Sequence, residues 1–118
     1  MRVHLVSAAA AMAVLAVAAP VQAKDRYGYQ AISAKDFAKA EARINAERRI
    51  YPNRPELMLN LAHVYRHTGR FIQARSLYAE VLALDAVELD LPSGRVATSH
   101  ELASLGLAML QSNDLAAR

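Results

Sequence analysis

Two histidines with helical spacing are the residues best suited to chemistry in this chain. His63 and His67 are four positions apart, so on a helix both imidazoles would lie on one face, at a spacing that suits a metal ion. A catalytic zinc ion needs a third protein ligand, and His100 or Glu56 would supply one only through tertiary folding. The sequence has no HExxH pattern. We therefore predict two surface histidines without a metal, and a pH- or metal-responsive role is the weaker alternative.

The other reactive side chains form no catalytic set. Ser99, His100 and Glu101 are triad residue types, but neighbours on a helix point about 100° apart and cannot form a proton relay. The chain has no cysteine, which excludes thiolate zinc sites, thiol catalysis and disulfides. The sequence also has no glycine-rich phosphate loop and no acidic metal-binding cluster. These observations predict a protein that is not an enzyme and uses no cofactor.

The N-terminal stretch that ends at Ala23 has the features of a secretory signal peptide. Arg2 precedes an apolar run over residues 3–19, Pro20 ends the run, and Val21-Gln22-Ala23 places small residues at positions −3 and −1 of a cleavage site. The alternative is an uncleaved anchor, but the run is short and alanine-rich for a membrane-spanning helix. We expect cleavage after Ala23, which would leave residues 24–118 as the domain of a periplasmic or secreted bacterial protein.

The charge of the chain argues against nucleic-acid or membrane-surface binding. It carries 14 Lys and Arg against 11 Asp and Glu, and only Arg2 of these precedes residue 24, so the expected domain is mildly basic. Arginines concentrate between Arg43 and Arg75, whereas acidic residues predominate from Glu80 onward. Two solvated faces of different sign are one interpretation, and a basic patch that attracts an acidic partner is the other.

The elements that must position these residues repeat with a step of 34. The repeated residues are apolar or small, and the pairs are Phe37 and Phe71, Ala40 and Ala74, Ile44 and Tyr78, and Gly28 and Ala62. Such a step is typical of a unit of two antiparallel helices and a turn. In the clearest unit we expect a helix over 55–65, a turn at Thr68-Gly69-Arg70 and a second helix over 71–85.

This unit resembles the tetratricopeptide family. The family spacing of a bulky residue, a Leu-small pair and a tyrosine is present as Met58, Leu61-Ala62 and Tyr65. Ala74 and Tyr78 match the small and aromatic positions of its second helix, whereas Ala86 stands where the family has a proline. The resemblance implies an all-α solenoid of helix-turn-helix repeats that binds a protein or peptide without catalysing a reaction.

We expect about two and a half units, over 24–54, 55–88 and a final half unit. The first unit would have helices over 25–33 and 37–50, with Ala34-Lys35-Asp36 at the turn in place of glycine. An insertion over 89–98 breaks the period, and the segment 86–98 predicts a loop or a short extended pair. A capping helix over 99–112 would follow, started by a capping box of Thr98 and Glu101, with the remnant of a turn at 113–115.

The resemblance also implies a concave peptide-binding groove lined by the first helix of each unit. Its apolar floor and cationic rim would suit a peptide with hydrophobic anchors and a carboxylate. Asp25 and Tyr29 occupy places where the carboxylate-binding subgroup of the family has lysine and asparagine, so that ligand is not expected. The groove residues would be Tyr29, Ile32, Leu59, Asn60, His63, Arg66 and His67, with His100 and Leu107 from the half unit. The alternative is that these side chains are exposed and have no dedicated ligand.

The final helix is apolar on more than one side. Leu107 and Leu110 lie outside the predicted buried stripe of Leu102, Leu105 and Met109. They would contact the 86–98 loop, a partner protein or a second copy of the chain. The sequence thus supports two functions, a protein-interaction adaptor in the bacterial envelope and, as the alternative, a structural protein that dimerises through its C-terminal helix.

Overall fold

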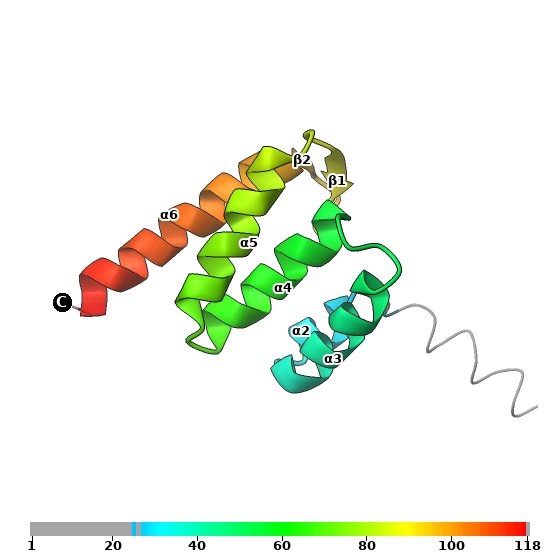
Figure 1. Ribbon diagram of the computed structural model, residues 1–118, viewed down its shortest axis with the longest axis horizontal. Helices are drawn as coiled ribbons and strands as arrows, with labels where there is room; N and C mark the ends of the chain where they lie inside the picture. Colours follow the sequence, from blue (N-terminus) through cyan, green and yellow to red (C-terminus); the bar gives the residue numbers. More distant parts are fainter. Residues whose placement is uncertain (1–24, 26, 118) are drawn as a thin grey trace, which may run out of the picture.

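The chain folds into packed helices, and a small two-stranded sheet connects the last two of them. The computed structural model describes residue 25 and residues 27–117, so the predicted signal peptide and its cleavage site lie outside the described residues. Within them the helices are α2 (Tyr29–Ser33), α3 (Phe37–Arg48), α4 (Pro55–His67), α5 (Phe71–Ala83) and α6 (Ser99–Ala117). The strands β1 (Glu88–Asp90) and β2 (Val96–Thr98) lie between α5 and α6 (Figure 1). The prediction of a predominantly helical fold is confirmed, with a two-stranded sheet that a purely α class does not include.

Helix α4 lies at the centre of the molecule and packs against α3, α5 and α6. Its neighbour α6 runs alongside α5 in Figure 1. None of the helices in the described part of the chain is both long and apolar enough to cross a membrane.

The observed helices match the predicted ones within about two residues, except at the start of the first and the end of the last. Helix α2 begins at Tyr29 rather than at residue 25, because Gly28 has a left-handed φ of 72° that no preceding helical turn could continue. Asp25 is buried just before it and accepts a hydrogen bond from the backbone N of Gln30 at 2.7 Å. Arg43 of α3 pairs with the other carboxylate oxygen of Asp25, so this buried charge is neutralised.

The 34-residue step is present in the backbone as well as in the sequence. The turn between α4 and α5 uses Gly69 at φ 78°, and the turn between α2 and α3 uses Lys35, 34 positions earlier, at φ 60°. A left-handed backbone is easy for glycine and strained for a lysine. Both turns therefore adopt the same conformation although only one has the residue that favours it.

Small residues let the helices approach closely at matching positions. A Cβ atom added at Gly28 would lie 2.9 Å from the side chain of Ile44, and one added at Gly106 would lie 2.2 Å from the ring of Tyr78. Ile44 and Tyr78 are one repeat step apart in the sequence, and both are buried. Each close contact excludes a larger side chain, because real Cβ atoms do not approach so closely.

Of the two conformations expected for 86–98, a loop or a short extended pair, the structure shows the extended pair, as an antiparallel hairpin. Leu89 lies opposite Ala97 in its register. Ser99 fixes the open end of the hairpin, since its Oγ accepts from Val87 N at 3.0 Å and its own N donates to Val87 O at 2.8 Å. Ser99 is buried, so these bonds satisfy polar groups that water does not reach.

Helix α6 begins as predicted and ends later. The capping box is present, with Glu101 N donating to Thr98 Oγ1 and Thr98 N donating to Glu101 Oε2, both at 3.1 Å. The predicted end at residue 112 and turn remnant at 113–115 are wrong, because the helix continues to Ala117. Neither glycine nor proline interrupts residues 107–117, and Asp114 is paired with Arg75 of α5 at 3.2 Å.

The predicted buried face of α6 is also wrong. Leu110 is only 1% exposed and belongs to the core, and Leu107 is half-buried and packs against it, so Leu110 is not accessible to a partner. Leu105 and Met109, which were expected inside, are 52% and 39% exposed. The contact of Gly106 with Tyr78 sets this rotation, because the glycine side of the helix is the side that fits closely against α5.

Candidate functional site

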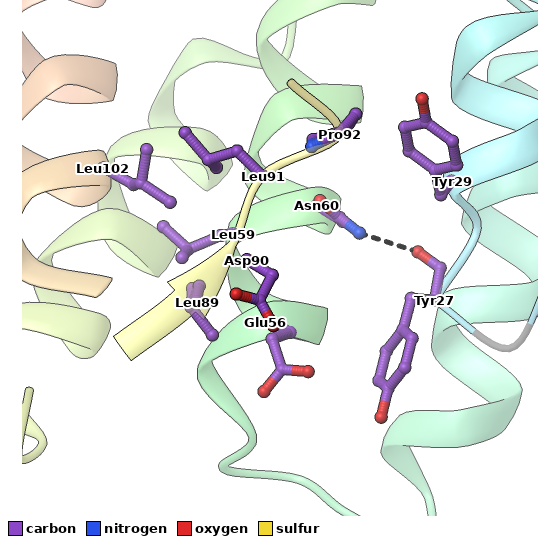
Figure 2. A pocket seen from close by; sticks show the side chains of 10 residues that line it. All are labelled: Tyr27, Tyr29, Glu56, Leu59, Asn60, Leu89, Asp90, Leu91, Pro92 and Leu102. Atoms are coloured by element: carbon purple, nitrogen blue, oxygen red, sulfur yellow. Dashed lines mark hydrogen bonds between the residues drawn. The ribbon is translucent and has the colours of Figure 1, made fainter. Parts of the chain in front are cut away.

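A cleft of about 530 Å³ opens beside the N-terminal half of α4. Its walls come from the segment before and within α2, from α4, from the hairpin and the turn after β1, and from α6. The lining residues are Tyr27, Tyr29, Glu56, Leu59, Asn60, Leu89, Asp90, Leu91, Pro92 and Leu102. Leucines from α4, the hairpin and α6 gather on one side of the view in Figure 2, and the two tyrosines lie on the other.

Helix α4 provides the floor of the cleft. Glu56, Leu59 and Asn60 lie at positions i, i+3 and i+4, so one face of the helix presents all three. Asn60 Nδ2 donates a hydrogen bond to the backbone O of Tyr27 at 2.9 Å, drawn as the dashed line in Figure 2. Arg54 Nη1 donates to the Tyr27 hydroxyl at 3.2 Å. These two bonds fix the tyrosine wall relative to α4.

The hairpin provides the opposite wall and is fixed at its base. Leu91 N donates to Arg95 O at 2.8 Å and closes the turn that carries Leu91 and Pro92. His100 Nε2 lies 2.7 Å from the backbone O of Leu84, and it must carry the proton because a carbonyl oxygen only accepts. His100 therefore ties α6 to the end of α5. We had expected His100 to line the groove, but it is not among the residues that line the cleft.

The charge of the cleft is opposite to the predicted one. Its ionisable lining residues are the acids Glu56 and Asp90 together with the two tyrosines, and no lysine, arginine or histidine of the described residues lines it. Asp90 is exposed and Glu56 is half-buried. The expectation of a cationic rim around an apolar floor is therefore wrong for this cleft, although the apolar floor itself is present.

The structure divides the predicted groove residues among three places. Tyr29, Leu59 and Asn60 line the cleft. Ile32 packs against the hydrophobic core. His63, Arg66 and His67 lie on the later turns of α4, where the two imidazoles lie beside Phe37 of α3 and Arg66 Nη2 lies 3.5 Å from His63 Nδ1.

The two histidines form an aromatic cluster with Phe37. The imidazole centroids of His63 and His67 are 4.2 Å apart, and the ring of His67 stacks on Phe37 with centroids 5.4 Å apart. Burial, then the nearby His67 and Arg66, lower the pKa of His63 to about 4, and burial also lowers the pKa of His67. Neutral rings pack well against phenylalanine, so the cluster favours a packing role between α3 and α4. Among the described residues, no three histidines or acids gather where a metal ion would bind.

Sequence reasoning missed the acidic and hairpin parts of the lining. The missed residues are Tyr27, Glu56, Leu89, Asp90, Leu91, Pro92 and, as a lining residue, Leu102. The signal that points to the hairpin is the ten-residue interruption of the 34-residue step, since an insertion into a repeat usually forms a loop on one face. Glu56 follows from helical spacing, because it lies three and four positions before Leu59 and Asn60.

Comparisons with family models, with curated proteins and with solved structures found no match to this chain. The function is therefore inferred from the geometry of the cleft and from the repeat.

Proposed function

We propose that this protein is a non-catalytic interaction module built on a tetratricopeptide-type helical repeat, and that the cleft binds a segment of a partner protein. The matching turns at Lys35 and Gly69 support the repeat, as do the matching close contacts at Gly28 and Gly106. Helix α4 packs against its hairpin partner α5 and against α3 and α6 of the neighbouring units, which is the packing that such a repeat requires.

The observation that carries the proposal is the composition of the cleft walls. The segment around α2, helix α4 and helix α6 each begin a repeat unit, and all three contribute lining residues. A volume of about 530 Å³ with mainly apolar and aromatic walls lies within the range of known ligand sites. The polar side chains of the lining are few, and no set of them resembles a nucleophile with its base, which favours binding over catalysis.

The proposed setting is the bacterial envelope, because residues 1–23 have the order of regions found in secretory signals. An adaptor there would hold one component of an extracytoplasmic assembly. Mass spectrometry of the exported protein tests this part directly, and the expected N-terminal residue is Lys24.

Site-specific photo-crosslinking in the producing cell tests the binding function. A photoreactive phenylalanine analogue replaces Tyr29, which lines the cleft and is 51% exposed, and in a matched control it replaces Ile72, which is exposed on α5. We expect a discrete adduct from position 29, absent at position 72 and lost when Leu91→Asp places a charge in the apolar wall. Equal adducts at both positions, or none at position 29, would contradict a binding role for the cleft.

Self-association remains a second candidate, on different residues from those first expected. Leu105 and Met109 are four positions apart on α6 and form an exposed apolar strip, whereas Leu110 is buried. Light scattering of the protein beside a Leu105→Glu, Met109→Glu variant tests this candidate. A dimer that becomes a folded monomer in the variant supports it, and a monomeric parent rules it out.

A further inference from the structure

We propose that the cleft selects a peptide segment in which a lysine or arginine lies next to a large apolar side chain. The inference rests on the proposed function, and it specifies the chemistry of the partner. It is the opposite of the carboxylate-bearing ligand that a cationic rim would favour.

Two carboxylates reach the same cleft from different elements. Glu56 belongs to the first turn of α4 and Asp90 ends β1, so the fold brings together two acids that are far apart in the sequence. A carboxylate in the first turn of a helix also stabilises the helix dipole, which explains Glu56 in part. Asp90 cannot stabilise a helix dipole in this way, because it lies in strand β1 and not in the first turn of a helix.

Neither carboxylate is paired with a cationic side chain among the described residues. The ion pairs of the described residues are those of Asp25 with Arg43, Glu41 with Arg70 and Asp114 with Arg75. Glu56 and Asp90 take part in none of these pairs, and no hydrogen bond joins either side chain to another described residue. Within the described part of the chain, both carboxylates are therefore left for a cation of a ligand.

The nearest arginine in sequence is already engaged. The guanidinium of Arg54 stacks on the ring of Tyr51 at 3.8 Å and donates to the Tyr27 hydroxyl. It is not part of the lining and strengthens the tyrosine wall. The described lining is acidic although the whole chain has a net charge of +3, so the acidity of the cleft does not result from an acidic composition.

The remaining walls suit the rest of such a ligand. Leu59, Leu89, Leu91 and Leu102 provide an apolar surface, and Figure 2 shows their side chains grouped together. The tyrosines opposite can contact a guanidinium or ammonium group through their ring faces. Figure 2 also shows the carboxyl groups of Glu56 and Asp90 in one part of the cleft, between the leucine and tyrosine walls. A basic residue with an apolar neighbour would thus contact both kinds of wall at once.

Selection from a random displayed peptide library tests this proposal. The baits are the purified protein, a Glu56→Gln, Asp90→Asn variant, a Leu91→Asp variant and a Glu80→Gln control, because Glu80 is an exposed acid of α5 outside the cleft. The charge variants should fold normally, since neither side chain has a partner within the described residues. Enriched peptides are then titrated by fluorescence anisotropy, together with copies in which each Lys or Arg is replaced by Glu or by Ser.

We expect enrichment of Lys or Arg beside Leu, Ile, Phe or Met, and binding that weakens as salt is raised. If each carboxylate contributes about threefold to tenfold, as expected for partly exposed charge pairs, the Glu56→Gln, Asp90→Asn variant should weaken binding by about tenfold to a hundredfold, whereas Glu80→Gln should leave it unchanged.

Three results would overturn the inference. The enriched peptides could bind the parent but not the Leu91→Asp variant and show no preference for Lys or Arg, or a preference for Asp or Glu. That result would refute the ligand chemistry and leave the proposed function intact. If the parent enriches no peptide over the Leu91→Asp bait, both the ligand chemistry and the proposed binding function are refuted. A dimer in solution that Glu56→Gln, Asp90→Asn dissociates would show that a second copy of the chain occupies the cleft.

Discussion

Replacing Gly106 by alanine tests the close packing that fixes the last helix against the rest of the fold. Glycine is a poor residue in the middle of a helix, and alanine there gains about 1 kcal/mol of helix propensity. Considered alone, α6 should therefore become more stable. The structure predicts the opposite, because the new Cβ would lie 2.2 Å from Cζ of Tyr78 and within 2.6 Å of two further ring atoms.

The magnitude follows from how far the ring must move. Ordinary carbon–carbon contacts are about 3.5–4.0 Å, so the ring or the helix has to retreat by more than about 1 Å. Tyr78 is only 4% exposed and cannot swing into solvent. Overpacking of a well-packed site costs about 1–3 kcal/mol, and overlap with three atoms places this case in the upper part of that range. After the propensity gain we expect a net loss of about 1–2 kcal/mol, or roughly 5–15 °C in Tm for a domain of this size.

Thermal and urea unfolding of four variants separates the two contributions. Ala108→Gly, at an exposed position of the same helix, measures the propensity alone and should cost about 1 kcal/mol. In a Tyr78→Leu background, which removes the ring, Gly106→Ala should become neutral or stabilising. The reasoning is refuted if Gly106→Ala raises Tm in the parent, or if its effect and that of Tyr78→Leu are additive.

Three further predictions concern the turn, the histidine cluster and the capping box. Lys35→Gly should stabilise the fold by about 0.5–1 kcal/mol in urea unfolding because φ is 60°, whereas Gly69→Ala at φ 78° should destabilise it by a similar amount. The folded state lowers the pKa of His63 to about 4 from 6.5, so stability is complete above pH 6.5 and should fall as pH drops from 6.5 to 4. The loss should be about 1–2 kcal/mol after discounting for the solvent-exposed part of the ring, and unfolding curves of a His63→Gln variant should lack this component. Thr98→Ala should cost about 1 kcal/mol in urea unfolding, because it removes the side-chain bond to Glu101 N; an unchanged midpoint would contradict the capping role.

The repeat made most of the helical framework predictable. The 34-residue step carries both the apolar positions and the turn, so knowledge of the turn at Gly69 located the turn at Lys35 even without a glycine. The capping box was predictable for a different reason, since the reciprocal bonds of Thr98 and Glu101 depend only on a local spacing of three positions. Features that repeat or that depend on neighbours in sequence can be inferred from one chain.

The charge of the cleft depends on a contact that the sequence does not encode locally. Arg66 and the two histidines were expected at the groove because they share α4 with Leu59 and Asn60. The helix is longer than the cleft, however, and its later turns pack against Phe37. Asp90 reaches the cleft only because the hairpin folds over the start of α4, and the hairpin lies outside the repeat. Its position is set by long-range bonds, such as those of Ser99 with Val87, which no periodic pattern predicts.

The wrong face of α6 has a physical explanation that also bears on function. Leu61 and Ala62 of α4 correspond to Leu105 and Gly106 of α6, and in α4 both are buried because that helix has neighbours on several sides. In α6 only the glycine of this pair is buried, against Tyr78, and the leucine is exposed. The sequence of α6 is thus that of a helix with a neighbour on its outer side, whereas within the described residues that side is open to solvent. Two exposed apolar side chains cost the monomer little stability, but burying them would stabilise a complex. Leu105 and Met109 are therefore the positions at which we expect a second copy or another chain to dock, if one does. If the Leu105→Glu, Met109→Glu variant matches its parent in both molar mass and stability, the strip has no partner, and the proposal of a binding function then rests on the cleft.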